Sequence, residues 1–179
     1  MTLDDAKIQA ERYGQQLHGL GLPGDARSRV AFACFAVAQQ HHSAMLILLD
    51  RPNPLQSSAF ALLRPLMEAT LRGEWVLHCA TDDQVQNFAL GGKQQLDMAS
   101  VIKALEKLNP GSDAHRILYL NNWKIVSSYT HGFEHQVQHW LVESDVAPKY
   151  EPEQIAWLLN AGTACFRLCV SSIQSLAAR

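Results

Sequence analysis

The sequence predicts an all-α fold, an antiparallel bundle of about six or seven helices. Apolar residues recur at helical spacing along most of the 179 residues. No alternation of Val, Ile or Thr with polar residues lasts long enough to indicate a strand. Short segments rich in Gly, Pro and Asn separate the apolar stretches, and none has the composition of a linker between domains. We therefore expect residues 1–179 to form a single domain.

The first two helices have clear boundaries. The first is expected from Leu3 to Leu17 and ends in the loop Gly19–Gly24. Asp25 is a residue type that caps helix N-termini, so a second, long helix is expected after it, reaching about Leu49. We expect this helix to be largely buried because its middle and end are apolar; the residues concerned are Phe32, Phe35, Val37, Ala38 and the run Met45–Leu49.

A proline-rich turn separates the second helix from the third. In Asp50–Pro54, each proline disfavours helical geometry in the residue before it, so the second helix must stop there. The third helix is expected from about Leu55 to Ala80 and is the most apolar of all.

The second half of the chain is expected to contain further helices. A fourth begins at Thr81 and runs to about Leu108, weakened at Gly91–Gly92. The remaining elements are, in order, a helix from Ser112 or Asp113 to about Thr130, a break at His131–Gly132, a short helix to Val142, the loop Ala147–Pro152 and a last helix from Glu153 to Ala178.

The composition is that of a globular protein without a strong overall charge. Hydrophobic residues make up 47%, charged residues 18%, and the net charge is −2. Such a chain has no general basic field that would coat nucleic acid. A local basic site could still act on RNA.

The cysteines indicate a reducing compartment. None forms a C-x-x-C pair, and each lies among apolar neighbours, so we expect small core residues; the four are Cys34, Cys79, Cys165 and Cys169. With no apparent signal peptide, reduced thiols predict a cytoplasmic protein. The longest apolar run, Ala31–Ala38, is far shorter than the roughly 20 residues of a membrane span, so no membrane association is expected.

A stripe of charge on the third helix is the first candidate site. Arg64, Glu68 and Arg72 are spaced four apart and share one face of a helix otherwise suited to burial. Buried charges are costly unless paired, and Glu68 can pair with either arginine. Pro65 adds a local perturbation because it removes a backbone donor. The stripe is either a structural ion-pair ladder or a site in which an arginine anchors an anion such as phosphate.

A second polar cluster lies at the expected helix end near residue 130. It contains Asn122, Lys124 and His131. A histidine at such a position can titrate near neutrality and act as acid or base, or it can cap buried carbonyl groups. Two polar clusters on apolar helices predict one shared interior site that brings His131 to Arg64 and Glu68.

These motifs together resemble a known type of protein. Arg64-Pro-Leu-Met-Glu68, followed by Tyr129-Thr-His-Gly132, resembles an uncharacterised bacterial all-helical family with an R-x-x-x-E helix and a Thr-His motif, related to HEPN-type bundles. Many HEPN proteins are metal-independent ribonucleases of toxin–antitoxin or phage-defence systems, usually dimeric. The resemblance implies a homodimer that acts on RNA or a nucleotide without a cofactor and has a cognate antitoxin.

The resemblance also suggests roles for the candidate residues. As an enzyme, the protein would use His131 as the acid–base group, Arg64 or Lys124 to bind phosphate, and Glu68 to orient them. The HEPN signature places an arginine four to six residues before a histidine, whereas here a lysine, Lys124, lies upstream of His131. As a binding module, the protein would use the same residues to hold a nucleotide or a partner segment without turnover.

A histidine-based metal site is the remaining alternative. His131-Gly-Phe-Glu-His135 matches the H-x-x-E-H zinc motif, His139 lies one helical turn further, and His41–His42 could add a ligand from another helix. Gly132 disfavours a regular helix through the motif, and we expect the protein to bind no metal.

Overall fold

The computed structural model describes residues 1–92, 97–108, 123–130, 134–142 and 145–178, and the structural statements below concern these residues. They contain eight helices and a pair of two-residue strands, so the fold is all-α, as predicted. The elements are α1 (Leu3–Leu17), α2 (Ala26–Leu49), α3 (Gln56–His78), α4 (Asp82–Ala89), α5 (Met98–Leu108), α7 (Trp123–Thr130), α8 (Glu134–Gln138), β1 (Leu141–Val142), β2 (Asp145–Val146) and α9 (Pro152–Ala177).

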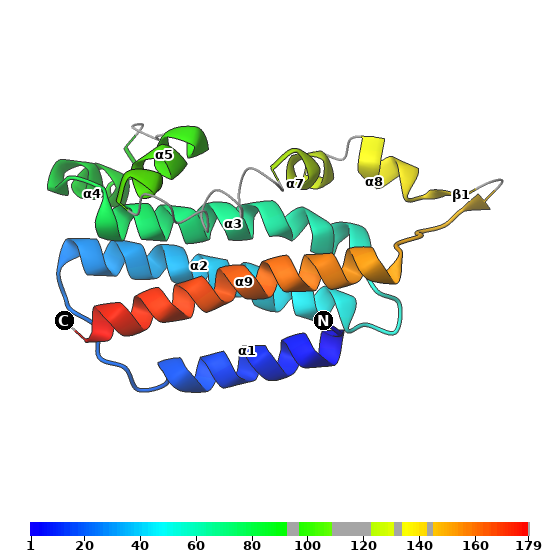
Figure 1. Cartoon of the computed structure of the whole chain (residues 1–179), viewed down its shortest axis with the longest axis horizontal. Helices are drawn as coiled ribbons and strands as arrows, with labels where there is room; N and C mark the ends of the chain where they lie inside the picture. The colour runs from blue at the N-terminus through cyan, green and yellow to red at the C-terminus, as the bar shows by residue number, and fades with distance from the viewer. Residues whose placement is uncertain (93–96, 109–122, 131–133, 143–144, 179) are drawn as a thin grey trace.

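Four long helices, α1, α2, α3 and α9, form the main bundle (Figure 1). Helices α1, α2 and α3 run alternately up and down, and α9 packs against all three. The shorter helices α4, α5, α7 and α8 lie along the outer side of α3, and of these α5 and α7 contact α3 directly. Helix α3 therefore carries much of an outer layer of short helices, and α4 of this layer also packs against α2.

Side-chain caps fix the start of the first two helices. Thr2 accepts a hydrogen bond from the backbone N–H of Asp5, whose carboxylate accepts one from the N–H of Thr2. Asp25 likewise accepts one from the N–H of Ser28. Each cap satisfies backbone donors that the first turn leaves without partners. The predicted bounds of α1 and α2 are confirmed, and those of α3 and α9 agree within two residues.

The prediction of one helix from Thr81 to Leu108 is wrong. Helix α4 ends at Ala89, and Gly91 has a φ of +71°, a conformation that glycine adopts at low cost and that stops a helix. A new helix, α5, begins at Met98, where Asp97 accepts a hydrogen bond from the N–H of Ser100. The described residues accordingly contain eight helices rather than six or seven.

The predicted short helix is present as α8, but its predicted end at Val142 is wrong. Helix α8 ends at Gln138, and β1 then pairs antiparallel with β2, with Leu141 opposite Val146. The predicted helix end at Thr130 is confirmed by α7, whereas the predicted start at Ser112 or Asp113 and the break at His131–Gly132 lie outside the described residues.

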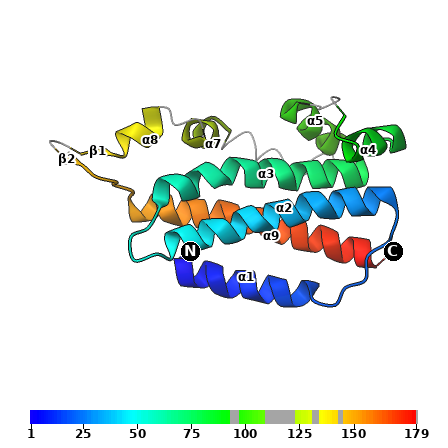
Figure 2. The same cartoon turned by 180° about the vertical axis from the view of Figure 1, so that it is seen from behind.

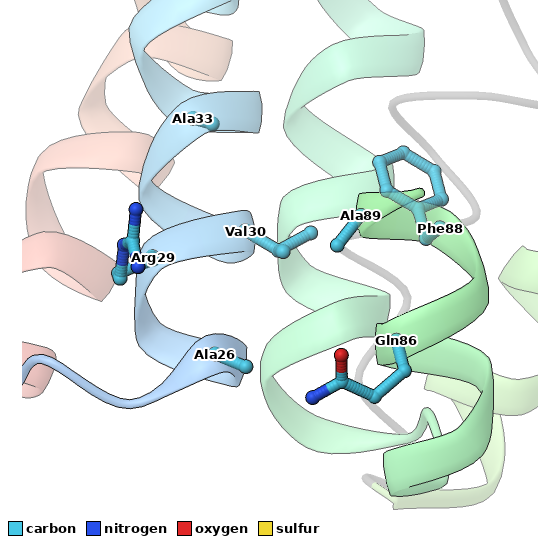
Figure 3. Close-up of a pocket in the computed structure, with 7 residues that line it drawn as sticks. All are labelled: Ala26, Arg29, Val30, Ala33, Gln86, Phe88 and Ala89. Carbon is cyan, nitrogen blue, oxygen red and sulfur yellow. The ribbon is translucent and has the colours of Figure 1, made fainter. Parts of the chain in front are cut away.

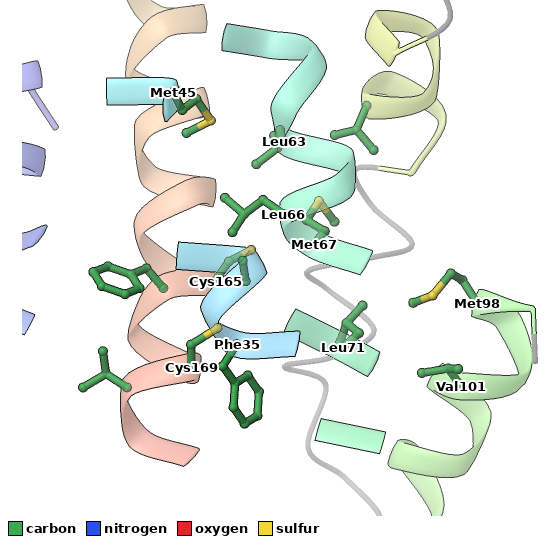
Figure 4. Packing of buried hydrophobic residues seen from close by; sticks show 14 of the residues in the cluster. Phe35, Met45, Leu63, Leu66, Met67, Leu71, Met98, Val101, Cys165 and Cys169 are labelled. Atoms are coloured by element: carbon green, nitrogen blue, oxygen red, sulfur yellow. The ribbon is translucent and has the colours of Figure 1, made fainter. Parts of the chain in front are cut away.

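The cysteines are core residues, as predicted. Cys34, Cys165 and Cys169 are buried, Cys79 is half-buried, and all four are free thiols. Figure 4 shows Cys165 and Cys169 on α9 among the apolar side chains between that helix, α2 and α3. Burial raises the pKa of the Cys34 thiol to about 11 and that of Cys169 to about 12, so both remain protonated and unreactive at neutral pH.

Helix α2 is less buried than its composition predicts. Phe35 and Ala38 are fully enclosed, but Phe32, Val37 and Ile47 are 39%, 46% and 64% exposed. The apolar residues of α2 therefore occupy two faces, one in the core and one on the surface.

Two helices, α2 and α9, are long and apolar enough to cross a membrane by length and composition alone. Both also supply core residues to the bundle, and buried helices of soluble proteins pass the same test.

Gly73 marks a close contact between α3 and α2. A Cβ atom at this position would lie 2.4 Å from Cε1 of the buried Phe35 ring. Gly73→Ala should therefore cost about 1–2 kcal/mol of unfolding free energy, since overpacking outweighs the gain in helix propensity. Gly14 in α1 has no atom within 4 Å of an added Cβ. Gly14→Ala should instead stabilise by up to about 1 kcal/mol in the same denaturation assay, and equal effects of the two substitutions would contradict this packing.

Candidate functional site

The predicted ion pair on α3 is present. Nε of Arg64 donates a hydrogen bond to Oε1 of Glu68 over 2.9 Å, and α3 continues through Pro65 without ending. The two side chains are 22% and 28% exposed, so the pair is half-buried rather than enclosed in the core. Solvent reaches both groups and screens their attraction. Loss of either partner should therefore cost less than in a fully buried pair.

The other members of the predicted site are less completely described. Lys124 lies in the first turn of α7, which packs against α3, but its side chain lies outside the described residues. Asn122 and His131 lie outside the described residues altogether. The convergence of His131 with Arg64 and Glu68 stays a prediction.

His139 is part of an aromatic cluster at the N-terminal end of α3. Its Nδ1 lies 2.9 Å from the carbonyl oxygen of Lys149, and its Nε2 lies 3.0 Å from the hydroxyl of Tyr129. A carbonyl only accepts, so Nδ1 carries the proton and Nε2 accepts from the tyrosine. The imidazole also stacks on Tyr150, and both tyrosines pack on Phe60. Both ring nitrogens are thus engaged in hydrogen bonds that link Tyr129 of α7 to the backbone at Lys149.

The surroundings of His42 in α2 are not those expected of a metal ligand. His42 is 1% exposed and stacks on Phe166 with ring centroids 5.0 Å apart. Burial lowers the pKa of His42 to about 4, which keeps the ring neutral, and neither nitrogen has a hydrogen-bond partner among the described residues. In the described part of the chain, no three His, Cys, Asp or Glu side chains could hold a metal ion together. His131 and the side chain of His135 lie outside it.

A buried acid in α3 was missed by the sequence analysis. Glu74 is 5% exposed, and its Oε1 accepts a hydrogen bond from the hydroxyl of Ser172 on α9. Its other oxygen, Oε2, lies 3.7 Å from Nε2 of His78 in the last turn of α3. Burial raises the pKa of Glu74. A negative charge on Glu74 would favour positive charge on the neighbouring imidazole.

His78 connects this buried acid to a surface hollow. Its side chain is 39% exposed and lines a cavity of ≈ 470 Å³ between the end of α3 and α5. The residues that line the hollow are His78, Cys79, Ser100, Lys103, Ala104, Lys107 and Leu108. Of these described residues none is acidic, and three carry nitrogen groups that are, or can become, cationic. The arrangement can bind an anion.

The spacing of α5 explains how its lysines reach the hollow. Met98, Val101, Ile102 and Leu105 are buried, and they hold one face of α5 inside the fold. Ser100, Lys103 and Lys107 lie three and four residues apart and share another face. This amphipathic spacing is visible in the sequence. The prediction of one continuous polar helix over residues 81–108 does not place these lysines beside α3.

The chain matches one known family. The sequence model of a family of unknown function, DUF6988, matches residues 35–178. The matched region includes the Arg64–Glu68 pair, Glu74, His78 and all of α5. Comparison with curated proteins and with solved structures gives no match.

Proposed function

Because this chain belongs to DUF6988, a family of unknown function, we propose a function from its own residues: it binds a phosphate-bearing ligand, RNA or a nucleotide, in the hollow between α3 and α5. The observation that carries the proposal is the set of His78, Lys103 and Lys107 around one cavity with no acidic residue among its described lining. The net charge of the chain is −2, so the overall charge does not attract an anionic phosphate group. The site must therefore act locally.

Each lining group has a distinct role in this proposal. The ammonium groups of Lys103 and Lys107 attract phosphate oxygens as point charges, one helical turn apart. His78 donates a hydrogen bond to the same anion and is oriented by Glu74 behind it. Ala104 and Leu108 offer an apolar surface to a sugar or base. A volume of ≈ 470 Å³ falls in the range of small-ligand pockets.

RNA is the favoured ligand because a second cationic group lies along the same helix. Arg64 and His78 are fourteen residues apart on α3, which is about 21 Å along the helix axis. Fourteen residues are about 40° short of four whole turns, so the two side chains leave the helix on the same side. Both side chains keep some exposure to solvent, 22% for Arg64 and 39% for His78, so a strand bound at His78 has a second cationic group on the same side of α3. The resemblance of the Arg64–Glu68 and Thr-His motifs to HEPN-type proteins supports the same ligand class. A toxin or defence role with a cognate antitoxin, in the cytoplasm, belongs to this proposal.

Two lysine substitutions test the proposal. Lys103→Ala/Lys107→Ala should weaken binding of a fluorescein-labelled single-stranded RNA of about ten nucleotides by at least about tenfold. The slope of log affinity against log salt should fall by about 1.4, because two phosphate contacts are lost. Fluorescence polarisation at several salt concentrations measures both quantities.

The matched control is Lys149→Ala. Lys149 is an exposed lysine far along the chain, with 62% of its side chain accessible. Its removal changes net charge by one but touches no group at the hollow. Unchanged binding by the double variant, or an equal loss with Lys149→Ala, would contradict the proposed site.

A further inference from the structure

One face of α2 carries exposed apolar side chains that the described part of the chain leaves uncovered. Figure 2 shows α2 in front, with α3 above it and α1 below it. Between Arg29 and Asp50 the helix has no acidic residue, lysine or arginine. Phe32, Val37 and Ile47 are 39%, 46% and 64% exposed along this stretch. An apolar helix face of this length is typical of an interaction surface.

We propose that this face of α2 packs against α2 of a second copy of the chain, antiparallel across a two-fold axis. An axis that passes between residues 39 and 40 places Arg29 opposite the partner's Asp50 and Phe32 opposite the partner's Ile47. Residues 29, 32, 40, 43, 47 and 50 are exposed and lie within about 60° of the direction of Arg29, and Val37 lies about 80° from it at the edge of the face. The face is thus complementary to itself in charge, with Arg29 at one end and Asp50 at the other.

The charges at the two ends determine the direction of pairing. Arg29 is exposed at the start of α2, and Asp50 is its C-cap residue. The two-fold arrangement forms the Arg29–Asp50 contact twice, whereas a parallel arrangement would place like charges together at each end. Asp50 already accepts a hydrogen bond from Lys7 over 2.8 Å, and its other carboxylate oxygen, Oδ1, can accept from an arginine.

Hollows at the two ends of the face accommodate the protruding side chains. One, of ≈ 480 Å³, lies between α2 and α4 beside Arg29, Val30 and Ala33 (Figure 3). The two-fold axis brings the partner's Ile47 to Phe32, across the helix face from this hollow and next to Arg29, which lines its edge. In the middle of the face, Ala36 lies opposite the partner's Ser43, and side chains this small let two helices approach closely. The charged ends favour a second copy because the two-fold arrangement pairs Arg29 and Asp50 at a fixed separation, which a fluid lipid surface does not do.

Sedimentation velocity tests the interface through an apolar residue. The unmodified chain should sediment as a dimer at micromolar concentration, and Ile47→Glu should raise the dissociation constant at least about 100-fold, because a charge is forced into an apolar contact. Val146→Glu is the control, since Val146 is 74% exposed on β2 and lies away from α2. It should leave the dimer intact.

A charge exchange tests the two-fold pairing itself. Arg29→Glu alone and Asp50→Arg alone should each weaken the dimer at least about tenfold, since each brings like charges together twice. Mixing the two variants should restore a heterodimer, in which both contacts join opposite charges. The proposal is overturned if the chain is monomeric, if the monomer instead sediments with lipid vesicles, if Ile47→Glu leaves the dimer intact, or if mixing restores nothing.

Discussion

Replacing His42 with phenylalanine should remove most of the loss of stability that the protein undergoes when the pH falls from 6.5 to 4. Burial lowers the pKa of folded His42 to about 4, whereas in the unfolded chain it is near its model value of 6.5. Below pH 6.5 the unfolded state binds the extra proton, so stability falls as pH falls and levels off below pH 4. The shift corresponds to about 3 kcal/mol. Phenylalanine cannot be protonated and can retain the stacking on Phe166.

Urea denaturation at a series of pH values measures this difference. At pH 7 the variant should be at least as stable as the unmodified protein, because the substitution removes two buried ring nitrogens that have no hydrogen-bond partner among the described residues. His18→Gln is the control for removing a histidine from the surface, since His18 is exposed after α1. If His42→Phe and the unmodified protein lose stability in parallel down to pH 4, the buried neutral histidine is contradicted.

Glu74→Ala should destabilise the fold by about 2–4 kcal/mol. The substitution leaves a void where α3 contacts α9 and deprives the hydroxyl of Ser172 of its acceptor. Glu74→Gln keeps an acceptor oxygen of similar shape and should largely preserve stability. Thermal and urea denaturation compare the two variants.

The pH dependence separates the buried carboxyl group from a purely steric role. Because burial raises the pKa of Glu74, its contribution is most favourable below the unfolded value of 4.5 and is lost as pH rises through the folded pKa. Glu74→Gln should therefore become more stable relative to the unmodified protein as pH rises from 4.5. The half-exposed Glu68 is the control on the same helix, and Glu68→Ala should cost no more than about 1 kcal/mol. Equal costs for Glu68→Ala and Glu74→Ala would contradict the difference in burial.

Local sequence signals were sufficient for most of the main bundle. Asp25 caps α2, and Pro52 and Pro54 end it, so both bounds of that helix follow from short-range chemistry. The same approach failed between Thr81 and Leu108. Gly91 was read as a weak point within a helix, whereas its positive φ ends α4. Glycine permits either outcome, and only the surrounding packing decides.

The candidate sites show the same limit. The Arg64–Glu68 pair follows from a spacing of four residues and was predictable. Glu74 and Ser172 are 98 positions apart, and the α5 lysines reach His78 only because α5 packs on α3. Hydrophobicity also could not tell the enclosed Phe35 from the exposed Phe32, since both are apolar residues of one helix. Only contacts between segments that are distant in the sequence determine which residues form these sites and which phenylalanine of α2 is buried.

The proposed binding of phosphate in the hollow between α3 and α5 can be tested directly by NMR. Titration of isotope-labelled protein with inorganic phosphate and then with AMP, followed by backbone amide and histidine side-chain NMR, locates the site directly. We predict that the largest shifts occur at Ser100, Lys103 and Lys107 and at the imidazole of His78. Shifts confined to the region of Arg64 and Glu68, or no saturable shifts with either ligand, would contradict the claim.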